Sequence, residues 1–312
     1  MHEKNMTGIT MIHILGFQFS QNINIVAFFL FLVNYFMTIC GNFLIITLVS
    51  YSKSLHSPMY FFLSQLAVSD ILLITDILPN MLHMNLVKET KVSFSDCITQ
   101  YYFFAVLEVL DSLLLTVMSY DRYLAICKPL HYNLIMNHQL SWIMVVTCWV
   151  VSFLVALIHT ITISKLQFCG PYVIDHFFCD LDPILGLACG DTSIVQLEIL
   201  YLVIIVAVIP FFIIIISYAY IIFTIYKIPS ITGRQKVFST CSSHLIVVSV
   251  YYVTLMSVYM VPSKGESWNM TKFFSLLYTV LTPLLNPIIY SLRNKELKNV
   301  FGRLINNFPK FQ

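Results

Sequence analysis

The sequence predicts an all-α membrane protein, a bundle of seven transmembrane helices followed by a short amphipathic C-terminal helix. Of the 312 residues, 58% are hydrophobic and 10% are charged, and the mean hydropathy is +0.83. Soluble domains carry charge on about a quarter of their residues. Three stretches, 5–52, 199–226 and 237–263, contain no Lys, Arg, Asp or Glu, and each exceeds the roughly 20 residues that cross a bilayer. This composition excludes a soluble, disordered or nucleic-acid-binding protein.

Apolar windows predict the seven spans in chain order. They cover 25–50, 58–82, 97–127, 141–163, 196–227, 237–262 and 272–292. Pro58 opens the second span, Pro129 follows the third and Pro229 closes the fifth. Proline is tolerated in the first turn of a helix but disrupts a helix that precedes it, so it marks helix boundaries. No second domain fits, so residues 1–312 are expected to form a single seven-transmembrane domain.

The segments outside the spans are predicted to be an N-terminal segment over 1–24, one long loop over 164–195 and a tail over 293–312. The loop is polar and is interrupted by Pro and Gly. In the tail, apolar residues recur at helical spacing among basic ones, which predicts an amphipathic helix on the inner membrane surface. These apolar residues are Leu297, Val300, Phe301, Leu304 and Ile305.

The distribution of basic residues predicts that the N-terminus is extracellular. With that orientation, 11 of the 17 Lys and Arg residues lie on the inner side, where the net charge is +9, and the outer segments sum to −2. Cytoplasmic loops carry such an excess of basic residues. The sequons at Asn5 and Asn269 then fall outside, and Asn5 is the expected glycosylation site. The chain is expected to be a multi-pass protein of the plasma membrane.

The eight cysteines divide evenly between the two environments. Cys97, Cys169, Cys179 and Cys189 fall in outer segments, and the other four fall in or below the membrane. An even outer set predicts two disulfides, for which the sequence by itself allows three pairings.

Five acidic residues fall inside the apolar spans, where an ionisable side chain is expensive and indicates function by default. They are Asp70, Asp76, Glu108, Asp111 and Glu198. Glu108 and Asp111 are three residues apart and therefore share a helix face.

Two motifs at the inner ends of spans carry a recognisable mechanism. Asp121-Arg122-Tyr123 ends the third span, and Asn286-Pro287-Ile288-Ile289-Tyr290 ends the seventh. With seven spans, they resemble the rhodopsin-like G-protein-coupled receptors. The pairing of Asp121 with Arg122 holds the guanidinium until the inner helix ends part, and Pro287 removes a backbone hydrogen bond and kinks its helix.

Longer blocks narrow this resemblance to the odorant receptor family. Leu55–Leu63, Met118–Cys127, Ser217-Tyr218, Lys236–Leu245 and Pro283–Asn294 occur in the family's order, and His176-Phe177-Phe178-Cys179-Asp180 resembles its outer loop. The resemblance implies that Cys97 pairs with Cys179, and Cys169 with Cys189. It also implies a G-protein-coupling switch at Asp121, Arg122, Tyr123, Tyr218, Asn286, Pro287 and Tyr290.

The resemblance further implies a polar cluster at mid-bundle. Asp70, Asp111 and Asn286 match positions that hold a sodium ion or exchangeable protons in the family. The alternative is a hydrogen-bonded patch among protonated acids. No other cofactor is expected.

The ligand is expected about one turn above this cluster, in a mostly apolar cavity that suits a small volatile or hydrophobic molecule. The expected lining is Phe104, Ala105, Glu108, Val109, Ser112, Leu202, Val206, Tyr252, Leu255, Met256 and Tyr259. An ionised Glu108 would select a cationic ligand such as a volatile amine, and a protonated one would donate to an oxygenated ligand. Alternatively, Glu108 bonds only to helix neighbours.

Two positions depart from the family. Tyr251-Tyr252-Val253 stands where these receptors usually carry Phe-Tyr-Gly, and Asp111 stands where they carry Glu. The first departure removes the backbone freedom of a glycine in the sixth span, and the second shortens the reach of the carboxylate.

The function implied is that of an odorant receptor that activates a stimulatory olfactory-type G protein and raises cyclic AMP. Two alternatives are a rhodopsin-like receptor for a non-odorant ligand and a transporter that uses the buried acids as a relay. The sequence contains no internal repeat that would favour a transporter. It also contains no Ser/His/Asp, HExxH or P-loop arrangement, so no enzyme is expected.

Overall fold

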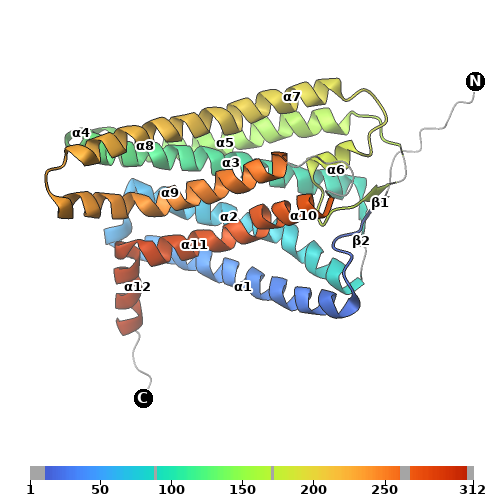
Figure 1. Cartoon of the computed structure of the whole chain (residues 1–312), viewed down its shortest axis with the longest axis horizontal. Helices are drawn as coiled ribbons and strands as arrows, with labels where there is room; N and C mark the ends of the chain where they lie inside the picture. The colour runs from blue at the N-terminus through green and yellow to red at the C-terminus, as the bar shows by residue number, and fades with distance from the viewer. Residues whose placement is uncertain (1–10, 88–89, 170–171, 261–267, 308–312) are drawn as a thin grey trace, which may run out of the picture.

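A computed structural model describes residues 11–87, 90–169, 172–260 and 268–307. Within them lie seven helices that are long and apolar enough to cross a membrane, as the sequence predicts. The helices lie side by side as one elongated bundle, with the strands at one end and α12 at the other (Figure 1).

The first four spans are single helices. They are α1 (Gln21–Tyr51), α2 (Pro58–Val87), α3 (Phe94–Cys127) and α5 (His138–Ser164). The short η1 (Lys53–Leu55) connects α1 to α2, and α4 (Pro129–Ile135) connects α3 to α5. The sixth span is α9 (Ile231–Met260). The structure therefore confirms the positions of these spans and extends most of their predicted ends by a few residues.

The fifth and seventh spans each contain a π-helical segment that the sequence analysis did not predict. The fifth consists of α7 (Ser193–Val203), η2 (Ile204–Val208) and α8 (Ile209–Lys227). The seventh consists of α10 (Trp268–Leu276), η3 (Leu277–Leu281) and α11 (Thr282–Arg293). Such segments are rare and occur frequently at functional sites.

Side-chain caps explain why two helices begin three residues before their predicted starts. The Ser93 hydroxyl accepts a hydrogen bond from the Asp96 amide at 3.0 Å at the start of α3, and Asn137 accepts from Leu140 at 2.8 Å at the start of α5. A capping side chain satisfies an amide that lacks a partner in the first helical turn. Hydropathy does not register these polar first turns, so the apolar windows begin too late.

The proline in the seventh span is matched by two residues of α1. Pro287 has no N–H, so the Pro283 carbonyl one turn earlier loses its helical partner. The Asn42 amide donates to that carbonyl at 3.1 Å. Gly41 makes this approach possible, since a Cβ there would lie 3.1 Å from Cγ of Pro287. α1 and α11 therefore pack closely around Pro287.

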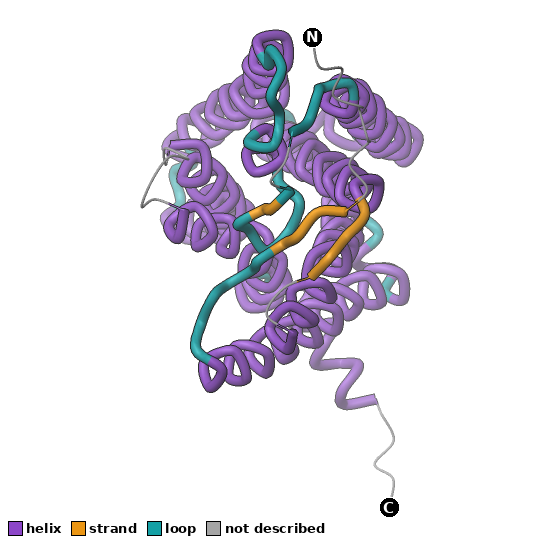
Figure 2. Tube along the Cα trace, turned by 90° about the vertical axis from the view of Figure 1, so that its right-hand side faces the viewer, coloured by secondary structure: helices purple, strands orange, loops and turns teal. Residues whose placement is uncertain are grey.

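A three-stranded sheet covers the centre of one end of the bundle (Figure 2). Its central strand β1 (Met11–Ile14) pairs antiparallel with β2 (Thr90–Ser93) and parallel with β3 (Val173–Ile174). The predicted N-terminal segment 1–24 therefore contains a strand, and α1 begins at Gln21, inside that segment. The other predicted loop, 164–195, holds β3 and the short α6 (Leu181–Leu185). Edge-strand pairing between segments so far apart leaves no local signal in the sequence.

Two disulfides lie at the same end of the bundle. Cys97 of α3 pairs with Cys179, and Cys169 pairs with Cys189, as the family resemblance implied. Gln100, one turn into α3, donates to the Asp76 carbonyl of α2 at 2.9 Å and accepts from the Cys179 amide at 3.0 Å. The long loop is therefore fastened to both α2 and α3.

A buried lysine joins the sheet to the seventh span. Lys272 of α10 is only 3% exposed, and its ammonium donates to the Gly16 carbonyl at 2.9 Å and to the Asp175 carboxylate at 2.5 Å. Gly16 adopts a φ of 63°, which glycine adopts more readily than other residues. His176 lies buried beside this lysine, and burial together with the ammonium lowers its pKa to about 3. His176 is therefore neutral throughout the physiological pH range.

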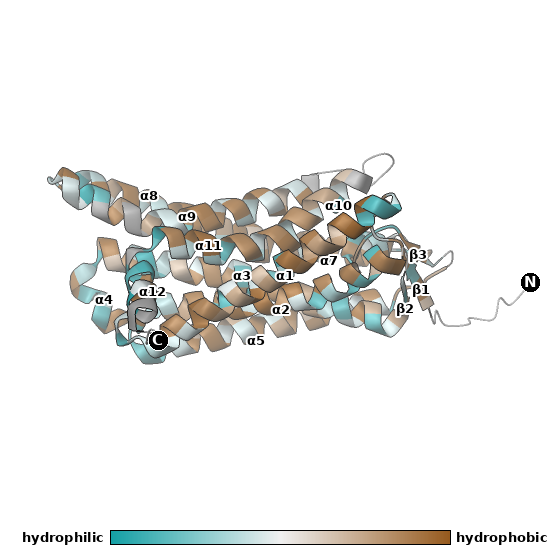
Figure 3. Ribbon diagram, turned by 90° about the horizontal axis from the view of Figure 1, so that it is seen from below, coloured by the Kyte–Doolittle hydropathy of each residue, from teal (hydrophilic) through white to brown (hydrophobic). Residues whose placement is uncertain are grey.

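Apolar side chains cover the length of the spans, and polar ones gather at the two ends (Figure 3). α12 (Lys295–Asn307) follows α11, and Asn294 caps it by accepting from the Leu297 amide at 3.2 Å. Leu297 and Val300 are buried against the bundle, and the side chains of Leu304 and Ile305 lie outside the described residues. The structure thus confirms the predicted tail helix.

We expect replacement of Lys272 by Ala to lower the free energy of unfolding by about 1–2 kcal/mol, because the buried Gly16 carbonyl loses its donor. The loss from the ion pair is small, because Asp175 is partly exposed and water screens it. Thermal unfolding of the purified receptor would measure the change. Lys91→Ala, at an exposed position on β2, is the control, and an equal effect of the two variants would contradict the role of Lys272.

Candidate functional site

Two small cavities adjoin in the half of the bundle beneath the sheet. The first, of about 80 Å³, lies among α3, α5, the fifth span and α9, and the second, of about 50 Å³, lies among α3, the loop after Cys179, α9 and the seventh span. Tyr101, Glu108, Leu181 and Leu255 line both. Both volumes are far below the several hundred Å³ of pockets for drug-sized ligands, so they suit a small molecule.

Most of the predicted ligand residues line these cavities. Ala105, Val109, Leu202 and Val206 line the first, Phe104 lines the second, and Glu108 and Leu255 line both. The side chain of Tyr259 lies outside the described residues.

Met256, also predicted to contact the ligand, is 47% exposed and lines neither of these two cavities. Tyr251, Leu255 and Val258 follow one another at helical spacing and form the cavity-facing stripe of α9. Met256 directly follows Leu255 and therefore points about 100° away from that stripe.

Two other predicted ligand residues, Ser112 and Tyr252, also line neither of these two cavities. The Ser112 hydroxyl donates to the Val206 carbonyl at 2.5 Å, and the Tyr252 hydroxyl donates to the Ala207 carbonyl at 3.5 Å. Both carbonyls belong to η2, where the helical hydrogen-bond pattern changes. These two side chains therefore support the π-helical backbone that forms the cavity wall.

The sequence analysis missed several lining residues from the loop and the neighbouring helices. They include Tyr101, His159, Phe178, Asp180, Tyr251, Ser275 and Tyr278. His159 lies 3.6 Å from the Glu198 carboxylate, measured between Nδ1 and Oε1. The sequence did contain a signal for His159, because it is an ionisable residue inside an apolar span. Its wide spacing from the other histidines gave no metal-site pattern, so it was not selected.

The departure at 251–253 leaves the sixth helix intact. Val253 is 65% exposed and faces away from the bundle, so a side chain at this position meets no neighbouring helix. Tyr251 is buried, and its hydroxyl donates to the Glu108 carbonyl at 3.2 Å. α9 remains one continuous helix through this region.

A polar cluster lies deeper in the bundle, among α2, α3 and α11. The Asn286 amide donates to both oxygens of Asp70, at 3.0 and 3.1 Å, and Asp111 is close enough to interact electrostatically with Asp70. Oδ1 of Asp111 and Oδ1 of Asn286 are buried without a hydrogen-bond partner among the described atoms. Among the described residues, His, Cys, Asp and Glu side chains form no group of three or more that could hold a metal ion.

The Asp121-Arg122-Tyr123 motif lies at the other end of the bundle, on the α12 side. Nε and Nη2 of Arg122 donate to Oδ2 of the fully buried Asp121 at 3.0 and 2.5 Å. The other oxygen of Asp121 accepts from the Tyr132 hydroxyl of α4 at 2.8 Å. Burial and the adjacent Asp121 raise the pKa of Tyr132, so this tyrosine remains a hydrogen-bond donor.

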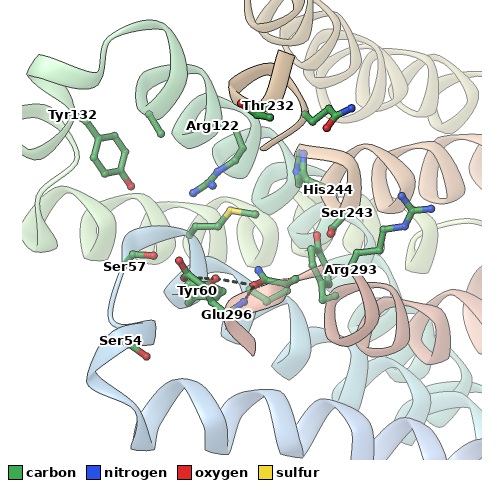
Figure 4. A pocket seen from close by; sticks show the side chains of 16 residues that line it. Ser54, Ser57, Tyr60, Arg122, Tyr132, Thr232, Ser243, His244, Arg293 and Glu296 are labelled. Carbon is green, nitrogen blue, oxygen red and sulfur yellow. Dashed lines mark hydrogen bonds between the residues drawn. The ribbon is translucent and has the colours of Figure 1, made fainter. Parts of the chain in front are cut away.

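Arg122 lines a large cavity of about 860 Å³ (Figure 4). Its walls come from the inner ends of α2, α3, α9 and α11 and from the start of α12, and include His244, Tyr290 and Arg293. Tyr218 of α8 and His244 of α9 are joined by a 2.6 Å hydrogen bond, and the Tyr290 hydroxyl is buried without a partner among the described atoms. Of the predicted switch residues, Arg122 and Tyr290 line this cavity, and Tyr218 bonds to the lining residue His244. Asn286 and Pro287 are buried earlier in the same helix as Tyr290. The ring of Tyr123 meets that of Tyr220 edge-on at 5.9 Å between centroids.

One more contact fixes the base of this cavity. The Tyr60 hydroxyl lies 2.7 Å from Oε2 of Glu296 and 3.0 Å from Oδ1 of Asn294 (Figure 4). α12 is thereby held against the start of α2.

Comparisons with known proteins agree with this architecture. The family described as Olfactory receptor matches residues 31–307. Olfactory receptor 1M1 of Mus musculus is 42% identical over 306 residues, which cover 98% of each chain. Olfactory receptor 6B1 of Homo sapiens is 41% identical over 304 residues, which cover 97% of each chain. The crystal structure of squid rhodopsin superposes with a TM-score of 0.74 at 17% identity, covering 93% of this chain and 87% of that one.

We expect Asn286→Leu to destabilise the protein by about 1–3 kcal/mol, because it leaves the buried Asp70 without its donor. Replacing both partners, in Asp70→Leu with Asn286→Leu, is expected to restore part of this loss, because neither polar group is then stranded. Thermal unfolding in lipid nanodiscs would measure both effects. Strictly additive losses in the double variant would contradict a direct bond between the two side chains.

Proposed function

Because the chain belongs to the olfactory receptor family, we propose that it binds a small, mostly hydrophobic odorant and signals by raising cyclic AMP. It is a multi-pass membrane receptor and not an enzyme, with a small-molecule ligand and a G protein as partners. The finer proposal is a stimulatory G protein of the olfactory type. Membership of the olfactory receptor family gives no support to the alternative function of a transporter.

The observation that carries this proposal is the pairing of Arg122 with Asp121 on the wall of the inner cavity. This arrangement fits a resting receptor, since the guanidinium is engaged within its own helix. Separation of the inner helix ends would release it toward a G protein. The ligand would do no chemistry, and would act by binding the open state more tightly than the closed one.

We further propose that the sheet faces the outside of the plasma membrane and that α12 lies on the cytoplasmic surface. Both disulfides are at the sheet end, as expected for an oxidising compartment, and basic residues concentrate at the other end. Asn5, the proposed glycosylation site, belongs to the outer N-terminal segment but lies outside the described residues.

A screen would test the main proposal. Cells that express the receptor with an olfactory-type stimulatory G protein and a cyclic AMP reporter would be exposed to a chemically diverse odorant panel. At least one compound is expected to raise cyclic AMP without ionic current through the receptor. A ligand-driven current, or a response routed only through an inhibitory G protein, would contradict the proposal.

Removing the Tyr132 hydroxyl should raise basal signalling. In Tyr132→Phe, Asp121 loses one hydrogen bond of the closed state, which contributes about 1 kcal/mol or somewhat more. A two-state equilibrium then shifts by roughly 5- to 10-fold toward the open form. Basal cyclic AMP, normalised to surface expression, is the readout. Arg122→Ala is expected to abolish the odorant response, and Tyr35→Phe, away from the inner cavity, is the matched control.

We also propose that Asp70, Asp111 and Asn286 hold a sodium ion. The unpartnered oxygens of Asp111 and Asn286 support this proposal, since hard cations prefer oxygen ligands. The wild-type receptor is expected to unfold at a higher temperature in sodium chloride than in choline chloride, and Asp70→Asn is expected to remove most of that difference. An equal sodium effect on stability and on the odorant response in both proteins would rule out the site.

A further inference from the structure

The two outer cavities differ in chemistry although they share Glu108. The first is walled mainly by aliphatic side chains of α5 and the fifth span, including Val155, Ile199 and Val203. Its polar members other than Glu108 are Tyr101, Tyr251 and His159, and the last of these already faces Glu198 at 3.6 Å. We call this cavity the apolar lobe.

The second cavity, here called the acidic lobe, carries carboxylates and aromatic rings. Glu108 and Asp180 line it, and the exposed Asp182 stands at its rim. The described residues that line either lobe include no lysine or arginine. The nearby Lys272 is committed to Gly16 and Asp175. The described lining of the acidic lobe is therefore acidic.

Four aromatic rings complete the walls of the acidic lobe, those of Tyr101, Phe104, Phe178 and Tyr278. Phe104 meets Phe178 edge-on at 5.0 Å between centroids and meets Tyr278 at 6.4 Å. A cage of aromatic faces attracts a cation, and structures use it to recognise ammonium groups.

A stranded hydroxyl points to a missing ligand in the same lobe. Ser275 is 1% exposed and lines the acidic lobe, and its Oγ has no hydrogen-bond partner among the described atoms. Buried polar groups are nearly always bonded, so an exception needs an explanation. A bound N–H donor would satisfy this oxygen.

The charge state of the loop carboxylate agrees with this chemistry. Burial raises the pKa of Asp180 to about 6, so the group is mostly ionised at neutral pH and an adjacent cation would favour that form further. Alkylamines, with pKa values near that of lysine at about 10, are protonated under the same conditions.

Resting on the proposed odorant-receptor function, we propose that the ligand is a small amine bound as its ammonium ion. The ammonium group lies in the acidic lobe, among Glu108, Asp180 and the Ser275 hydroxyl. The hydrocarbon part extends past Glu108 into the apolar lobe. Neutral odorants of the same shape would lack the positive charge that the carboxylates and aromatic rings of the acidic lobe attract, and would bind more weakly.

The test compares matched pairs of compounds on the full receptor. Hexylamine, cyclohexylamine and phenethylamine are each set against the alcohol of the same skeleton, with cyclic AMP as one readout. The second readout is the rise in unfolding temperature of the purified receptor in nanodiscs, which depends on binding alone. On the wild-type receptor, at least one amine is expected to be 10-fold or more as potent as its alcohol.

Three variants locate the ammonium group. Glu108→Gln and Asp180→Asn keep the shape of each side chain without the charge, and each is expected to weaken the amine response by about 10-fold or more. Ser275→Ala is expected to weaken it several-fold. Asp191→Asn, an exposed acid of the same loop that lines neither lobe, is the control and should respond as wild type. Surface labelling identifies variants that fail to fold, and the thermal shift is then measured on those that do.

The outcomes separate the ligand class from the receptor function. Alcohols that match or exceed their amines in both readouts overturn the amine proposal, and a cyclic AMP response to them would leave the receptor function standing. Amines that stabilise the purified receptor without any cyclic AMP response would support the site and contradict the coupling. Wild-type amine potency in both Glu108→Gln and Asp180→Asn would overturn the ammonium site.

Discussion

The constraint on which this structure depends is that polar groups inside the bilayer must find partners within the bundle, because lipid offers none. The seventh span at Pro287 illustrates it. The proline strands the Pro283 carbonyl, and the fold answers with an amide from another helix, Asn42, at 3.1 Å. Gly41 has no side chain, which lets α1 approach the ring of Pro287 closely. A distortion in one helix thus specifies two neighbouring residues in another, and the same demand couples Asp70 to Asn286.

The same constraint explains where the cavities lie. In a π-helical segment the regular hydrogen bonds shift, and side chains from neighbouring helices or turns compensate: Ser112 bonds to a carbonyl of η2, and Thr282 bonds to the Leu277 carbonyl of η3 at 3.1 Å. Each segment contributes cavity wall, η2 to the apolar lobe and η3 to the acidic lobe. Irregular backbone at membrane depth is tolerated where it borders a cavity, so the binding region and the backbone irregularities are one feature.

The sequence predicted what hydropathy and charge can report and missed what depends on distant contacts. The length of the apolar stretches predicts the seven spans. The helical spacing of apolar residues from Leu297 onward predicts the tail helix. The direction in which one residue faces is harder, since Leu255 and Met256 are equally apolar and only the packing of α9 separates them. The β1–β3 sheet and the contact of Lys272 with Gly16 join segments far apart in the chain. The caps at Ser93 and Asn137 were readable, but a hydropathy window weighs them as loop.

The cavities beneath the sheet and the arginine at the inner end are connected by α3 itself. Glu108 and Asp121 lie on one unbroken helix, separated by about 20 Å at 1.5 Å per residue. The partner element is α9, whose Tyr251 hydroxyl bonds to the Glu108 carbonyl and whose His244, two turns nearer the inner cavity, bonds to Tyr218. A ligand that binds beside Glu108 therefore acts where α3 and α9 are joined. In the proposed mechanism, a preference of the ligand for one separation of these helices would bias the pair formed by Asp121 and Arg122 at the other end of α3.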